Sequence, residues 1–173
     1  MTTDQLRPLV AIGVVRTAYT NRAHTPVQSS LNPAETATVE VDPRFAPALE
    51  GLDEFAYAWL LTWLGGPDSP AADDVPLRQV PFLLQRQGKE IGVLATRGPR
   101  RINPIGLSLV RILEVGATTV RFAGVDLVDG TPVVDIKPFV ARFDRPEGDI
   151  ACGWFDTVEL ADGSTPTSLH PES

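Results

Sequence analysis

Sixteen prolines interrupt this chain of 173 residues, and they leave few stretches in which an α-helix could continue. Between them, apolar residues recur mostly at every second position, which is the period of a β-strand with one buried face. Short helices are expected only at residues 43–52 and, more weakly, at residues 80–87. The sequence therefore predicts an all-β fold, with strands at residues 9–15, 36–41, 91–95, 107–115, 118–128 and 132–136.

A nearly continuous apolar run, FAYAWLLTWL, occupies residues 55–64. As a strand, this run would separate large side chains on one face from small ones on the other. The large ones are Tyr57, Trp59, Leu61 and Trp63, and the small ones are Ala56, Ala58 and Thr62. This split favours a strand with its bulky side toward the core. A short buried helix is the alternative, because periodicity alone does not decide a run of this kind.

Turn residues and the number of strands indicate how the sheet closes. Gly116 and the pair Asp129–Gly130 fall where hairpin turns would lie. Many strands with short connections imply a small antiparallel β-barrel with a few short helices, because closure removes exposed strand edges. We expect the barrel domain over residues 1–150 and a C-terminal extension over residues 151–173, with a mobile tail from residue 161.

Composition limits the classes of function. The single cysteine, Cys152, excludes an internal disulfide and a cysteine-rich zinc site, and His24 and His170 are too far apart to suggest a ligand pair. No apolar run approaches the ~20 residues needed to cross a bilayer, and the first residues lack the features of a signal peptide. We therefore expect a cytoplasmic protein with no metal site and no membrane partner.

Charge is distributed unevenly along the chain. The net charge is −7, yet residues 76–111 contain seven basic residues and one acid, Glu90. Local potential rather than net charge governs the attraction of a phosphate backbone, so an acidic protein can still present a nucleic-acid-binding face. The alternative is that several of these arginines are ordinary solvated positions beside a loop.

Three polar, turn-forming stretches lie between residues 94 and 139, namely LATRGPRRINPIGLS, GVDLVDGTP and VVDIKPF. Each sets polar side chains beside proline and glycine, which is typical of a rigid ligand pocket built on loops. Arg97 can offer a planar fork to a carboxylate or phosphate, unless it only pairs with Asp126 or Asp129. Asn103 can read an adenine edge, unless its side chain only caps its own turn.

Asp135 and Lys137 are two residues apart, so they would share one face of a strand and could pair with each other. A pair buried near a pocket would be costly unless it positioned something. We therefore expect Asp135 to be a polar pocket residue, with Lys137 as its partner or as a contact to a substrate phosphate.

Four blocks of sequence, in the right order, resemble the TrmO/TsaA-like family, also called YaeB or VirR-like. They are GLDEFAYAWLL at residues 51–61, ATR at 95–97 with NPIGLS at 103–108, DGTPV at 129–133, and DIKP at 135–138. The characterised members of this family are S-adenosylmethionine-dependent tRNA methyltransferases. The resemblance implies a TsaA-like barrel that forms a homodimer and binds the cofactor near the subunit interface, without a Rossmann domain.

The resemblance also implies roles for individual residues. Cofactor contacts are expected from Gln28, Arg97, Asn103, Ile105, Leu107, Asp129 and Thr131. Substrate contacts are expected from Arg16, Tyr19, Arg100, Arg101, Asp135 and Lys137. No residue is identified as a general base, because methyl transfer from a sulfonium mainly requires positioning and desolvation.

The chain departs from the family pattern at several positions. Val27 stands for an arginine, Gly65 for a histidine, Gly98 for a serine, Arg100 for an aromatic residue and Ile102 for a proline. The expected function is S-adenosylmethionine-dependent N-methylation, with N6-threonylcarbamoyladenosine in tRNA as the acceptor that the resemblance implies. Two alternatives stay open. One is a small-molecule methyltransferase with the same barrel and cofactor site, which the departures favour. The other is a non-catalytic nucleic-acid-binding module, which the mostly apolar setting of the aromatic residues disfavours.

Overall fold

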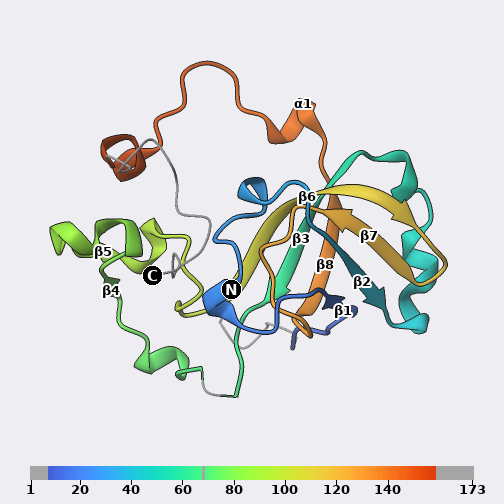
Figure 1. The fold of residues 1–173 in the computed structure, drawn as a ribbon, viewed down its shortest axis with the longest axis horizontal. Helices are drawn as coiled ribbons and strands as arrows, with labels where there is room; N and C mark the ends of the chain where they lie inside the picture. The colour runs from blue at the N-terminus through green and yellow to red at the C-terminus, as the bar shows by residue number, and fades with distance from the viewer. Residues whose placement is uncertain (1–7, 68, 159–173) are drawn as a thin grey trace, which may run out of the picture.

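A six-stranded antiparallel barrel dominates the computed structural model, which describes residues 8–67 and 69–158 (Figure 1). Its strands are β1 (Gly13–Arg16), β2 (Thr36–Val41), β3 (Tyr57–Trp63), β6 (Ile105–Val115), β7 (Thr119–Ala123) and β8 (Pro132–Pro138). They run around the barrel in the order β1-β2-β7-β6-β3-β8, and β8 pairs with β1 to close it. The predicted all-β barrel is confirmed.

Short elements surround the barrel. The strands β4 (Arg78–Gln79) and β5 (Ile91–Gly92) pair with each other outside it. The only α-helix in the described residues is α1 (Ala141–Asp144). The 3-10 helices are η2 (Arg22–His24), η3 (Ser29–Leu31), η4 (Pro43–Leu49), η5 (Leu52–Glu54), η6 (Ala72–Asp74), η7 (Phe82–Gln87), η8 (Val93–Ala95) and η9 (Gly153–Thr157). The helices expected at 43–52 and 80–87 are therefore present as the shorter η4 and η7.

The strand expected at residues 91–95 was too long. It ends at Gly92, because residues 93–95 turn as η8 and the backbone N–H of Thr96 donates to the carbonyl of Val93 (3.2 Å). The hairpin turn at Gly116 is confirmed, since its N–H donates to the carbonyl of Thr119 (2.8 Å) between β6 and β7.

The hairpin expected at Asp129–Gly130 is wrong. The expected strand at 118–128 ends at Ala123, where Gly124 takes a φ of 90° that favours glycine. The chain then crosses to β8, which lies between β3 and β1 rather than beside β7. Residues 124–131 therefore form a long connection at one end of the barrel, where a pocket can be built.

The apolar run at residues 55–64 is the strand β3, and its orientation is the reverse of the prediction. Ala58, Leu60 and Thr62 face the core and are 1%, 0% and 0% exposed. The larger Tyr57, Trp59, Leu61 and Trp63 face outward and are only half-buried or exposed. Part of the physical reason is local, because Gly106 of β6 lies so near Thr62 that a larger inward side chain would not fit there.

No helix in the part of the chain that the structure describes is long and apolar enough to cross a membrane. The tail expected to be mobile, from residue 161, lies outside the described residues.

Thr62 allows a test of this packing. Its hydroxyl is fully buried and finds no hydrogen-bond partner among the described residues. Thr62→Val keeps the shape of the side chain and removes the unsatisfied oxygen, so we expect a gain of about 1 kcal/mol in the free energy of unfolding. Urea titration measures the change. Thr25→Val is the control: the buried Thr25 hydroxyl donates to the carbonyl of Asn21 (2.8 Å), so this variant should lose stability. A loss in Thr62→Val as well would contradict this account of the barrel interior.

Candidate functional site

A cavity of about 1050 Å³ lies where one end of the barrel meets the loops around β4 and β5. The end of β3, the start of β6 and the connection before β8 form one wall, and residues 25–28 form another. Residues 79–83 and 94–103 face them from the β4–β5 side, which lies apart from the barrel in Figure 1. Segments far apart in sequence therefore meet around a single space.

The loop from Thr96 to Arg101 is held by hydrogen bonds at its base. The buried Thr96 hydroxyl donates to the carbonyl of Val93 (2.8 Å) and accepts from the side-chain amide of Gln79 (2.8 Å). Arg101 returns to the same point, donating to the carbonyl of Thr96 (3.1 Å). Because its base is fixed in this way, the loop can present Arg97 without a large cost of ordering on binding.

Arg97 is exposed and reaches across the cavity to Gln28. Its guanidinium Nη2 donates to the Gln28 side-chain oxygen (2.9 Å), joining residues 69 positions apart. Among the described residues it forms no ion pair with Asp126 or Asp129, so the purely structural pairing considered for Arg97 is absent. Both Arg97 and Gln28 were expected to contact the cofactor, and the structure brings them together at the cavity.

The NPIG segment passes close over β3. The backbone N–H of Leu64 donates to the carbonyl of Pro104 (2.7 Å), and Gly106 lies so near Thr62 that a Cβ there would stand 2.3 Å from the Thr62 hydroxyl oxygen. The glycine is therefore required for packing. Asn103 is exposed at the cavity, and its side chain makes no capping hydrogen bond within the described part of the chain.

Asp126 is a carboxylate at the cavity wall that the sequence analysis considered only as a partner for Arg97. Its two oxygens accept hydrogen bonds from the Ser108 hydroxyl (2.7 Å) and the Ser29 backbone N–H (3.0 Å). Burial raises the pKa of Asp126, and these hydrogen bonds together with the positive charge of Arg97 offset part of the rise. The only sequence signal for it was its place in GVDLVDGTP, three residues before Asp129.

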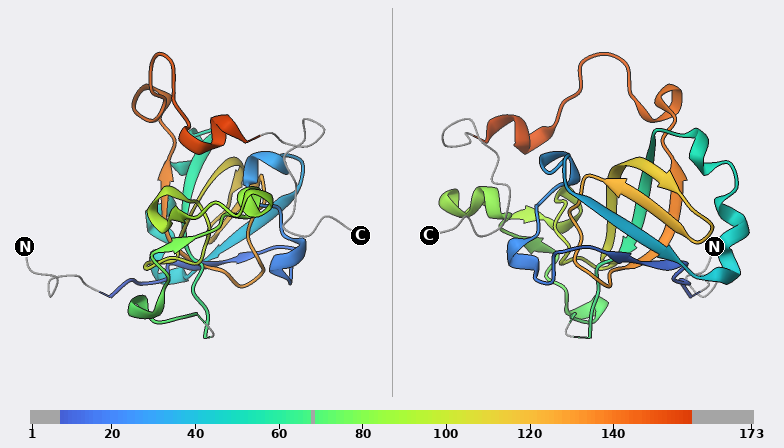
Figure 2. Two further views of the ribbon diagram at one scale, coloured as in Figure 1. Left: turned by 90° about the vertical axis from the view of Figure 1, so that its left-hand side faces the viewer. Right: turned by 45° about the vertical axis from the view of Figure 1, so that its right-hand side comes forward.

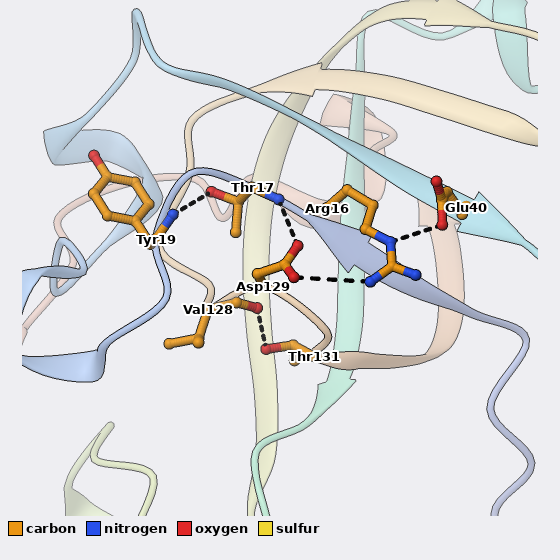
Figure 3. Close-up of polar contacts among 7 residues, drawn as sticks. All are labelled: Arg16, Thr17, Tyr19, Glu40, Val128, Asp129 and Thr131. Carbon is orange, nitrogen blue, oxygen red and sulfur yellow. Dashed lines mark hydrogen bonds and ion pairs between the residues drawn. The ribbon is translucent and has the colours of Figure 1, made fainter.

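Asp129 and Thr131 line the cavity, whereas Arg16 and Tyr19 do not. In Figure 3, Arg16 donates to Glu40 (2.7 Å) and lies 3.8 Å from Asp129, which also accepts from the backbone N–H of Thr17 (3.1 Å). The contacts of Asp129 hold the end of β1 against the connection before β8. The Tyr19 hydroxyl accepts from Asn32 (3.1 Å). Substrate contacts from Arg16 and Tyr19 remain a prediction.

Asp135 and Lys137 form the expected ion pair on one strand face, with 3.0 Å between the ammonium and the carboxylate. Both side chains are substantially exposed, at 43% and 63%, and neither lines the cavity. The pair is therefore a surface salt bridge rather than the buried one that the sequence analysis considered. A role for it with substrate remains a prediction, at a place separate from the cavity.

Three cavity residues were missed by sequence reasoning. Arg22 donates to the carbonyl of Leu64. The basic residues of the lining are Arg22, Arg97, Arg100 and Arg101, and the acidic ones are Asp126 and Asp129. Trp154 and Phe155 reach the cavity from beyond the barrel. Arg22 had no motif to mark it, and the aromatic pair lies beyond the family blocks. With four arginines and two aspartates, the lining favours anionic ligands.

The departures from the family pattern also gather at this cavity, since Val27, Gly65, Gly98, Arg100 and Ile102 all line it. They differ in how much space they leave. A Cβ at Gly65 would stand 2.6 Å from the Trp63 indole nitrogen, so a side chain there would displace the indole. At Gly98 the nearest atom would be 3.7 Å away, so a serine would fit.

Residues 8–67 and 69–158 contain no group of three or more histidine, cysteine, aspartate or glutamate side chains arranged to hold a metal ion.

Comparison with known proteins places this geometry in a family. Residues 14–145 match the model of the tRNA-methyltransferase O N-terminal domain. A "Probable S-adenosyl-L-methionine-binding protein" of Methanothermobacter thermautotrophicus is 36% identical over 81% of the chain and 93% of its own length. A protein of the same description from Archaeoglobus fulgidus is 35% identical over 84% of the chain, but only 37% of its own length is covered.

Two further relatives are a tRNA methyltransferase and a TrmO of known structure. The mouse "tRNA (adenine(37)-N6)-methyltransferase" is 33% identical over 79% of the chain and 31% of its own length. A crystal structure of TrmO from Pseudomonas aeruginosa superposes with a TM-score of 0.65 and 32% identity, covering 86% of this chain and 62% of that one. The chain thus spans about a third of the length of some relatives and nearly all of others. It belongs to the tRNA-methyltransferase O N-terminal domain family.

Proposed function

We propose that this protein is an S-adenosylmethionine-dependent N-methyltransferase that acts on adenosine in tRNA, with N6-threonylcarbamoyladenosine beside the anticodon as its acceptor. One observation carries the proposal. The seven residues expected to contact the cofactor come from three separate segments, and all seven line one cavity. The name of the mouse relative and the description of the matching family support tRNA as the substrate. A tRNA substrate would also fit the predicted cytoplasmic location.

The chemistry of the lining fits such a cofactor. When bound, S-adenosylmethionine supplies a methyl group on a positively charged sulfur. Arg97, fixed by its loop and oriented by Gln28, can bind a carboxylate through its planar fork. The Asn103 amide is free to pair with an adenine edge, and Ile105 and Leu107 offer exposed apolar surface. Asp126 holds a recessed negative charge that attracts a cationic group.

The remaining lining suits a polyanionic acceptor. Arg22, Arg100 and Arg101 lie on the same cavity and can attract phosphates. A volume of about 1050 Å³ is at the upper end of the ~300–1000 Å³ usual for one small ligand, so the space accommodates a cofactor together with an acceptor nucleoside. The protein's part in the reaction is then to hold the two reactants together and exclude water.

We further propose a homodimer. The outward row of β3 continues onto β6, where Trp59 lies beside Leu109 and Leu61 beside Leu107, so the exterior carries a connected apolar surface. Leu107 is 48% exposed and also lines the cavity, which supports cofactor contacts close to the subunit interface. A second copy of this chain is the occupant proposed for that surface.

Nucleoside analysis tests the function. Purified protein, S-adenosylmethionine and tRNA from a strain that lacks the gene are incubated without added metal, and the digested nucleosides are analysed by mass spectrometry. We expect a methylated form of N6-threonylcarbamoyladenosine to appear, and it should be missing from untreated tRNA of that strain. If the treated tRNA contains the same nucleosides as the untreated tRNA, tRNA is rejected as the acceptor, and a small-molecule acceptor becomes the favoured alternative.

Arg97→Ala and Asn103→Ala should affect binding more than folding. Both side chains are exposed, so their loss should cost roughly 0.5 kcal/mol of stability or less. Loss of the charge-assisted contact of Arg97 should weaken cofactor binding by about ten- to a hundredfold, and loss of the neutral amide contact of Asn103 by about two- to tenfold. Calorimetry with S-adenosylmethionine and thermal melting separate the two effects. Arg142→Ala, an exposed arginine on α1 outside the cavity, is the control. A variant that unfolds while its folded fraction binds normally would show that the residue is structural.

The dimer should depend on the outward face of β3. Tyr57, which is 42% exposed, lies in the apolar row, and Tyr57→Glu would place a charge at the proposed contact. We expect wild type to sediment as a dimer at micromolar concentration and this variant as a monomer. Leu9→Glu, at a 60% exposed residue outside the row, should stay dimeric. A wild-type monomer that still binds the cofactor would reject the dimer.

Cofactor affinity should depend on pH through Asp126. Because burial raises the pKa of Asp126, this carboxylate takes up a proton at a higher pH than a free aspartate with its pKa of about 3.9. The ionised form attracts the positive sulfur and the protonated form does not, so affinity should fall as pH decreases through the raised pKa. Calorimetry at several pH values checks this. Asp126→Asn should flatten the profile, and S-adenosylhomocysteine, whose sulfur is neutral, should show a smaller dependence. An unchanged profile in Asp126→Asn would assign the effect to another group.

A further inference from the structure

The chain beyond the barrel returns to the cavity. After β8 it passes through α1, arcs over the molecule and comes back toward the β4–β5 side, as Figures 1 and 2 show. There the indole N–H of Trp154 donates to the carbonyl of Ala95 (2.8 Å), directly before the loop that carries Arg97. The family match ends at residue 145, so this contact is made by a segment outside the family domain.

Trp154 and Phe155 form a stacked pair at the cavity. Their ring centroids are 3.9 Å apart and the rings are inclined by 26°. Phe155 is 41% exposed and Trp154 half-buried, and both line the cavity. Two stacked rings cover only one face of each, so an aromatic face remains available to a planar ligand.

The segment that carries the pair is held locally. In η9, the carboxylate of Asp156 accepts from the backbone N–H of Cys152 (2.7 Å), and the Thr157 hydroxyl donates to the carbonyl of Trp154 (2.9 Å). With the indole anchored to Ala95 as well, Trp154 is restrained from both sides. Leu94, which is 77% exposed beside the anchor point, extends the apolar lip of the cavity.

We propose that Trp154 and Phe155 are a stacking platform for the base of the methyl acceptor. The inference rests on the proposed function and adds an acceptor-binding element to it. Any base can stack on an aromatic face. An enzyme that modifies a base must hold that base outside the stack of neighbouring bases in the nucleic acid. Trp154 is anchored at Ala95, directly before the loop that carries Arg100 and Arg101, which are expected to contact substrate. All seven residues expected to contact the cofactor lie inside the family domain and do not include the pair.

The experiment compares full-length wild type with Trp154→Ala, Trp154→Phe and Phe143→Ala. Phe143 is a 79% exposed aromatic residue on α1, outside the cavity, and serves as the control. One arm measures KM for tRNA and for S-adenosylmethionine. A second arm needs no activity: adenosine is titrated calorimetrically into protein saturated with S-adenosylhomocysteine. Thermal melting confirms that each variant is folded.

We expect Trp154→Ala to raise KM for tRNA and to weaken adenosine binding by roughly ten- to a hundredfold, while affinity for the cofactor stays within about twofold. Trp154→Phe should restore most of both, because phenylalanine keeps an aromatic face, and Phe143→Ala should behave as wild type. A loss of cofactor affinity in place of adenosine affinity would overturn the assignment to the acceptor, and unchanged binding in Trp154→Ala would overturn the platform itself. If wild type leaves tRNA unmodified but binds adenosine more tightly than Trp154→Ala does, tRNA is rejected as the substrate. The stacking platform is then still supported.

Discussion

A close contact between β3 and β6 is the constraint on which the site depends. Gly106 lies against Thr62 with no room for a Cβ, so only glycine fits at this position of β6. The backbone N–H of Leu64 donates to the carbonyl of Pro104, so the NPIG segment enters β6 at a fixed position beside the end of β3. The same packing that fills the core therefore determines where the loop with Asn103 ends.

Hydrogen bonds from a few side chains then join the loops to that frame. Thr96 fixes the base of one loop, and Asp126 ties the connection before β8 to Ser29 and Ser108. Arg97 and Gln28 connect the two sides of the cavity. These are polar contacts on residues with little conformational freedom, so a ligand would meet side chains that are already in place, which lowers the entropic cost of binding.

The sequence predicted the barrel because alternation and turn residues are local signals. It predicted β2 at its observed bounds and the turn at Gly116 for the same reason. It failed where neighbours in space decide the outcome. The outward turn of Tyr57 and Trp59 depends on what the inward face of β3 meets, such as Gly106 beside Thr62, and the false hairpin at Asp129 depends on which strand comes to lie beside β8. At the site, the family resemblance indicated seven residues that line one cavity. Asp126 was considered only as a partner for Arg97, and Trp154 was missed, because their positions follow from long-range contacts that no local pattern records.

Closure of the barrel also has a consequence for biogenesis. The first strand pairs with the last, Gly13 with Val133, and the residues that follow β1 and those that precede β8 supply different walls of the cavity. β8 is synthesised near the end of the domain, so β1 has no partner on one edge until nearly the whole domain has left the ribosome. Contacts this distant in sequence also form slowly. A nascent chain therefore carries an open sheet edge for most of its synthesis, and the cavity comes into existence only with the final pairing.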